Sequence, residues 1–114
     1  MRKTLKFDVD PLSLETSRGF RNMIKDLASL QYKSAKVNSK NITVKIYLWF
    51  SKDRAQLFPN IEERIYKRAD QVMYGLEGLV YDSVSSISNA VKFIKPATKG
   101  KIEIELNFPV TKTK

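Results

Sequence analysis

The sequence predicts a single α+β domain in which two helices pack on one face of a mixed β-sheet. Several segments alternate apolar and polar residues as strands do, two others repeat apolar residues at helical spacing, and the resulting order is β-α-β-α-β-β-β. The chain has 114 residues, 42% of them hydrophobic, which suits one domain with a modest core. We expect this domain to span residues 1–110 and to leave residues 111–114 as a basic C-terminal tail.

The first half of the chain is expected to form a strand, a helix and a second strand. Residues 4–9 alternate in the strand manner, and Asp10-Pro11 ends that strand because proline lacks an amide donor. Apolar residues at helical spacing predict a helix over residues 21–31. Residues 41–50 (NITVKIYLWF) are β-branched and aromatic, which is typical of a central strand.

The second half is expected to contain one long helix and three strands. An apolar stripe predicts a helix over residues 61–77, and Gly78 follows as its C-cap. Residues 79–81 predict a short strand, and residues 87–94 and 101–108 predict two longer ones. Because the short segment PATKG joins the last two strands, we expect them to form an antiparallel hairpin.

The amino-acid composition excludes several kinds of catalytic site. The chain contains no cysteine, so it has no disulfide, no cysteine-based zinc site and no thiol nucleophile. It contains no histidine, the usual general base and transition-metal ligand. Hydrolysis would therefore depend on carboxylates acting with a divalent cation such as Mg²⁺.

The charge and hydropathy of the chain indicate a partner and a location. The formal net charge of +9 favours a polyanion, with nucleic acid as the first candidate and a generically basic surface as the alternative. The first residues lack the apolar region of a signal peptide, and no apolar run approaches the ~20 residues that span a bilayer. We therefore expect a soluble, intracellular protein without a membrane partner.

Acidic residues gather in and after the second predicted helix. Glu62 and Asp70 lie on one ridge of that helix, and Asp82 follows after one cap and one short strand. If these three carboxylates converge, they form a Mg²⁺ site able to activate water for phosphodiester cleavage. Alternatively, Glu62 stabilises the helix N-terminus, Asp70 pairs with a neighbouring cation such as Arg64, Lys67 or Arg68, and Asp82 caps a turn.

The order of these motifs resembles the RusA-like family of Holliday junction resolvases, which are common in bacteriophages and prophages. The segments that carry the resemblance are VDPLSLETSRGFR, ITVKIYLWF, the proline-led helix ending in Leu-x-Gly, LVYDSVSSI, VKFIK and KIEIEL. In the family, the helix begins with Asp-x-Asp-Asn and carries a further aspartate. A strand then leads into Asp-Asp-Ser-Gln-Ile.

The catalytic positions of this chain depart from the family pattern in either of two registers. Aligned on Pro59, the helix keeps Glu62 and Asp70 at acidic family positions; aligned on Gly78, it keeps none, and arginine or tyrosine stands there. In both registers the serine and valine after Asp82 occupy the places of the family's Asp-Asp, and Asp82 itself is one position early. Because valine does not ligate Mg²⁺, the resemblance implies impaired or absent cleavage.

Three functions follow from the resemblance and these departures. The first is a homodimeric protein that binds branched or duplex DNA without efficient cutting, in the cytoplasm of a bacterial host cell. The second is an active Mg²⁺-dependent junction endonuclease with Glu62, Asp70 and Asp82 as a rearranged catalytic and metal site. The third is a repurposed phage protein that inhibits a host protein or defence system, with exposed tyrosines Tyr66 and Tyr74 as anchors. The expected DNA-binding residues are Arg18, Arg21, Lys67, Arg68, Lys92, Lys95, Lys99 and Lys101.

Overall fold

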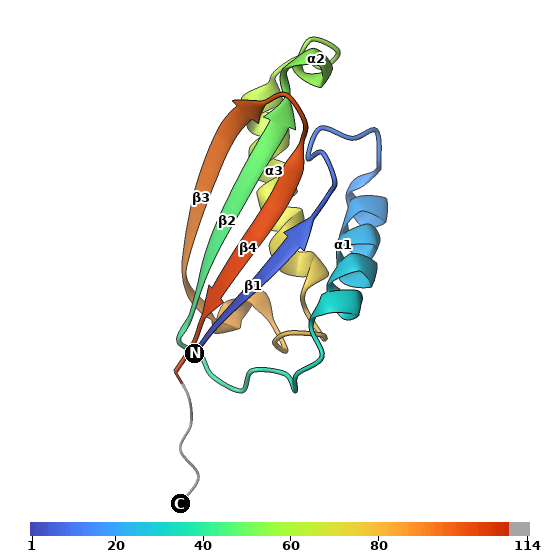
Figure 1. Ribbon diagram of the computed structural model, residues 1–114. Coiled ribbons are helices and arrows are strands. Elements are labelled where there is room, and N and C mark those ends of the chain that lie inside the picture. Colours follow the sequence, from blue (N-terminus) through green and yellow to red (C-terminus); the bar gives the residue numbers. More distant parts are fainter. Residues whose placement is uncertain (110–114) are drawn as a thin grey trace, which may run out of the picture.

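The chain builds a four-stranded sheet with its long helices on one face, as Figure 1 shows for the computed structural model, which describes residues 1–109. The elements in chain order are β1 (Arg2–Phe7), α1 (Ser17–Gln31), β2 (Ile42–Ser51), α2 (Lys52–Ala55), α3 (Ile61–Gly75), the 3-10 helix η1 (Val84–Ser86), β3 (Ile87–Ala97) and β4 (Lys101–Asn107). The predicted α+β class and mixed sheet are confirmed. The expected C-terminal tail, 111–114, lies outside the described residues.

The sheet order is β1-β4-β2-β3, so the two longest strands are neighbours and run parallel. β4 runs antiparallel to both β1 and β2. The predicted hairpin between the last two strands is therefore wrong, because β2 lies between β3 and β4. The segment 98–100 crosses the end of β2, which lets the apolar side of β4 reach the centre of the sheet and leaves the more exposed β3 at its edge.

The helix layer rests on close contact between α1 and α3. Gly75 in α3 permits this contact, since a Cβ at that position would lie 2.9 Å from the Arg21 carbonyl oxygen and 3.0 Å from Ile24 Cβ. The core side chains of the two helices are Phe20, Ile24, Ala28, Ile65, Ala69 and Val72. They face the buried side of the sheet, and within residues 1–109 no helix covers its other side (Figure 1).

Strand β2 shows how the sheet separates its two faces. Ile42, Val44, Ile46 and Leu48 are fully buried under the helices. The residues between them are only half-buried and point to the open face. This alternation gives the domain an aliphatic core on one side of β2 and a polar and aromatic surface on the other.

One helix begins earlier than apolar spacing predicts, and one short helix is not predicted at all. α1 begins at Ser17 because the Thr16 hydroxyl accepts a hydrogen bond from the Gly19 amide at 3.0 Å, a polar cap that apolar periodicity does not detect. A short helix, α2, occupies part of the expected loop after β2, where the Ser51 side chain caps its first turn.

The strand predicted over residues 79–81 is a turn instead, held by an isolated bridge between Glu77 and Tyr81. α3 ends at Gly75, and the Val80 amide donates to the Leu76 carbonyl. Gly78, expected as the C-cap, lies after the cap residue Leu76 and adopts a left-handed φ of 81°. Consecutive burial of Val80 and Tyr81 requires this turn, because a strand would place them on opposite faces.

We expect the domain to lose stability in alkaline solution because of Tyr81. This fully buried side chain donates its hydroxyl proton to the Met73 carbonyl, and burial, assisted by the charge of Glu77, raises the pKa of Tyr81. In the unfolded chain this tyrosine ionises at about pH 10, whereas in the folded chain it stays neutral to higher pH. The free energy of unfolding should therefore fall by about 1.4 kcal/mol between pH 8 and pH 11.

Urea denaturation at a series of pH values measures this loss. Tyr81→Phe removes the ionisable group and should flatten the pH dependence while lowering stability at neutral pH, where the hydrogen bond is lost. An equally steep alkaline loss in wild type and Tyr81→Phe would show that other groups cause it.

Candidate functional site

The structure does not bring Glu62, Asp70 and Asp82 together as ligands of one metal ion. Asp70 in α3 pairs with Lys92 of β3, with 2.9 Å between Oδ1 and Nζ. Asp82 pairs with Lys36 at 2.8 Å, and Glu62 is exposed in the first turn of α3. In the part of the chain that the structure describes, no three Asp, Glu, His or Cys side chains gather as a metal site requires.

The segment after Asp82 closes a turn. The Ser83 hydroxyl accepts a hydrogen bond from the Ser85 amide and begins η1. The Val84 amide donates to the Glu77 carboxylate at 2.9 Å. Ser83, rather than Asp82, therefore caps this turn, and Ser83 and Val84 maintain local backbone structure.

Lys92 of β3 reaches the side of α3 that carries Asp70. Its ammonium contacts Asp70 and lies 5.8 Å from the centre of the Tyr66 ring. Asp70 thus forms an ion pair, as the alternative to a metal site predicts, but its partner comes from the sheet rather than from its own helix. Tyr66 and Tyr74 are exposed on this side of α3, at 52% and 45%, as the sequence predicts.

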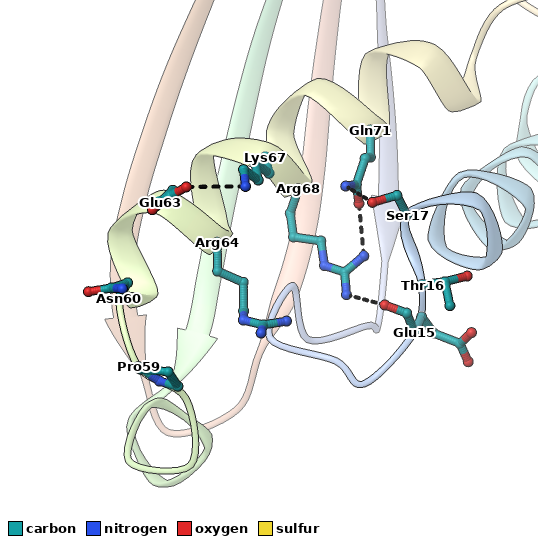
Figure 2. A pocket seen from close by; sticks show the side chains of 10 residues that line it. All are labelled: Glu15, Thr16, Ser17, Pro59, Asn60, Glu63, Arg64, Lys67, Arg68 and Gln71. Atoms are coloured by element: carbon teal, nitrogen blue, oxygen red, sulfur yellow. Dashed lines mark hydrogen bonds and ion pairs between the residues drawn. The ribbon is translucent and has the colours of Figure 1, made fainter.

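Arg68 is a structural residue, which corrects its assignment to the DNA-binding set. Its side chain is buried, and its guanidinium donates to the Ser13 carbonyl at 3.0 Å. It also donates to the Glu15 carbonyl at 2.7 Å (Figure 2). It also donates to Gln71 and covers the Phe20 ring. Burial and the nearby Arg64 lower the pKa of Arg68, while Glu15 opposes that change.

The position of Arg68 in the helix contained the signal for this role. Arg68 is three residues after the buried Ile65 and four before the buried Val72, so it lies on the apolar side of α3. An arginine there reaches backbone carbonyls across the helix layer rather than solvent. It ties the irregular segment before α1 to the middle of α3.

A cleft of about 420 Å³ lies between the start of α1 and the first half of α3 (Figure 2). Its cations already have partners: Arg64 lies over the Phe58 ring, Lys67 pairs with Glu63 at 3.1 Å, and Arg68 is bound as described. This cleft is therefore a weaker candidate for phosphate binding than its basic residues suggest.

Two further predicted DNA-binding residues, Arg18 and Arg21, are exposed on α1, in the helix layer.

The open face of the sheet carries the remaining expected cations. Trp49 in β2 is paired with Lys95 of β3 on one side and with Lys101 of β4 on the other. Lys99 is exposed in the segment that joins those two strands. Three of the predicted DNA-binding lysines therefore meet at one end of the sheet, although they come from different elements.

Aromatic side chains accompany these lysines. The Tyr47 and Phe93 rings stack with centroids 4.7 Å apart, and Tyr47 and Trp49 stack at 5.7 Å. The Lys101 ammonium lies 4.4 Å from the centre of the Trp49 ring. This cluster is not among the predicted site residues, although the alternation of β2 places Tyr47 and Trp49 on the face opposite its aliphatic residues.

On the open face of the sheet, some cations have a carboxylate partner and others have none. Glu105 pairs with Arg2 at 3.2 Å and with Lys45 at 3.8 Å, and Glu103 pairs with Lys6 at 3.9 Å. Among residues 1–109, Lys95, Lys99 and Lys101 have no carboxylate partner. These three lysines form the unpaired basic end of the sheet.

Comparison with known proteins gives no family, since neither family models nor curated proteins match this chain. The likeness to RusA-like resolvases therefore remains a resemblance of motifs. In the described part of the chain, no helix has the length and apolar character needed to cross a membrane.

We expect Arg68→Ala to destabilise the domain by about 2–4 kcal/mol, because it leaves the Ser13 and Glu15 carbonyls without their charged donor. Lys67→Ala is the matched control: it removes a neighbouring cation whose ion pair with Glu63 is exposed, and it should change stability by less than about 1 kcal/mol. Urea denaturation of both variants measures the difference. Equal effects would contradict the structural role of Arg68.

Proposed function

We propose that this protein is a RusA-like DNA-binding protein that holds branched or duplex DNA without efficient cleavage. The observation that carries the proposal is the unpaired basic end of the sheet, formed by Lys95, Lys99 and Lys101. Cations without carboxylate partners are free to replace the counterions of a phosphate backbone, and the release of those counterions drives binding. Contacts of this kind give affinity without reading base sequence.

The other expected cations have a smaller part in this proposal. Arg18 and Arg21 are exposed on α1 and can extend the basic surface around the helix layer. Lys67 and Lys92 are each held by a carboxylate, so a phosphate must compete with Glu63 or Asp70 for them. The resemblance also implies a homodimer, which would present two basic surfaces to one branched DNA.

The arrangement of the carboxylates supports impaired cleavage. Metal-dependent hydrolysis needs converging acids, and Asp70 and Asp82 are engaged by two different lysines. As placed, Glu62, Asp70 and Asp82 do not fit one Mg²⁺ ion, so no catalytic step is assigned to them. An endonuclease with Mg²⁺ as cofactor remains the alternative that a cleavage assay decides.

A second candidate function is inhibition of a host protein. The exposure of Tyr66 and Tyr74 on α3 favours it. Tyrosines often anchor protein interfaces because they bury a large area and keep a polar tip. Binding that survives nuclease treatment and is lost in a Tyr66→Ala/Tyr74→Ala variant distinguishes this function from DNA binding.

We expect duplex and four-way-junction DNA to bind with an affinity that falls steeply as salt rises. Replacing Lys95, Lys99 and Lys101 with alanine should reduce the slope of log affinity against log salt by roughly 2–3, since each phosphate contact contributes about 0.9. Fluorescence anisotropy at several salt concentrations measures the slope. A control variant with alanine at the exposed Lys25, Lys33 and Lys40 has the same net charge and should keep the wild-type slope. A salt-independent affinity would contradict the proposal.

We expect a synthetic four-way junction to stay intact in the presence of Mg²⁺ or Mn²⁺ under conditions that saturate binding. Gel electrophoresis of end-labelled strands measures cleavage. Cutting that is abolished by Asp70→Asn would support the alternative endonuclease instead. Cutting that survives substitution of Glu62, Asp70 and Asp82 would place the chemistry elsewhere in the chain.

A further inference from the structure

The open face of the sheet carries an aromatic surface, defined here as Tyr47, Trp49 and Phe93. Their rings are nearly parallel, with interplanar angles of 14° and 9°, and they line a hollow of about 130 Å³ together with Lys95. Phe93 is 38% exposed on the edge strand β3. Within residues 1–109 no helix lies over this side of the sheet (Figure 1).

Two lysines lie beside the aromatic surface, one on each strand next to β2. Lys95 and Lys101 flank Trp49 on the two neighbouring strands and have no carboxylate partner in the described chain. The carboxylates nearest to them on this face, Glu103 and Glu105, are already paired with Lys6, Arg2 and Lys45. The surface therefore combines stacking area with positive charge.

This combination suits an unpaired strand better than a duplex. Proteins that bind single strands place successive bases on aromatic rings and phosphates on nearby basic residues. In a duplex, the bases stack on one another inside the helix and leave only phosphates and groove edges to the protein. Lysines alone serve either ligand, whereas an accessible ring stack adds affinity only for exposed bases.

We propose that the aromatic surface binds single-stranded nucleic acid by stacking a base on Phe93, the exposed end of the ring stack that Tyr47 and Trp49 support, while Lys95 and Lys101 contact the phosphates. The inference rests on the proposed DNA-binding function and specifies its ligand: the unpaired strand at a branch or a processed end.

The charges argue against a second copy of the chain as the occupant of this surface. A stable protein interface buries about 800 Å² on each partner, far more than three rings supply. Packing two copies face to face would also bury Lys45, Lys95 and Lys101 with the carboxylates of β4. Such burial removes the water around those charges and sets like charges near one another.

The chain contains a single tryptophan, so its fluorescence reports on this surface alone. We expect oligothymidine to quench Trp49 fluorescence and Phe93→Ala to weaken that binding about 10-fold or more, because a stacked base is worth a factor of that order. An abasic oligomer of equal length has the same phosphates without bases, and its binding should change less than about 2-fold. Tyr66→Ala is the matched control, since it removes an exposed aromatic ring from α3 and should leave both affinities unchanged.

Further measurements keep the outcomes distinct. Circular dichroism and thermal melting verify that each variant folds, and anisotropy with Trp49→Ala tests the third ring without the fluorescent residue. A parallel pair, oligodeoxyuridine and oligouridine, differs only in the sugar. Ring-dependent binding of either strand supports the proposal, and the tighter one identifies the ligand.

Absence of all nucleic acid binding would overturn the proposed function and this inference together. Salt-dependent DNA binding that is equal for abasic and base-bearing strands would overturn the inference alone. Light scattering that shows a wild-type dimer and a Phe93→Ala monomer would assign the surface to contact between copies, and would also overturn it.

Discussion

The alternation of β2 is the constraint on which the rest of this domain depends. Its aliphatic residues, Ile42 to Leu48 at every second position, hold the sheet against the helices, and the same period places Tyr47 and Trp49 on the opposite face. A slip of one residue would exchange the two faces, exposing the core and burying charge. Core and candidate binding surface are therefore fixed by one register.

Charged residues have two distinct roles around this sheet. Arg68, Asp70 and Lys92 make contacts within the domain. The buried Arg68 holds the segment before α1, and the more exposed pair Asp70 and Lys92 joins α3 to β3. Lys95 and Lys101 lie on the open face, where no carboxylate of the described chain neutralises them. A net positive charge alone does not distinguish these roles, because only the packing of the helices decides which cations face solvent.

The sequence predicts the fold class and most elements because their apolar patterns are long and regular. It fails where side chains outside the pattern decide, as at the Thr16 cap, at the turn ending in Tyr81 and in the pairing of β4, where a short connection suggested a hairpin. For the candidate site, it identified Lys95, Lys99 and Lys101 individually but missed the rings between them. Their proximity depends on strand order, which local patterns do not determine.

The most direct test of the account is a nuclear magnetic resonance titration of the isotope-labelled protein with a short single-stranded oligonucleotide. The account predicts that the largest shifts occur at the Trp49 indole N–H and in the backbone around Tyr47, Phe93 and Lys101. Shifts confined to α1 and α3, around Arg18, Arg21 and Lys67, with the Trp49 signal unmoved, would contradict it.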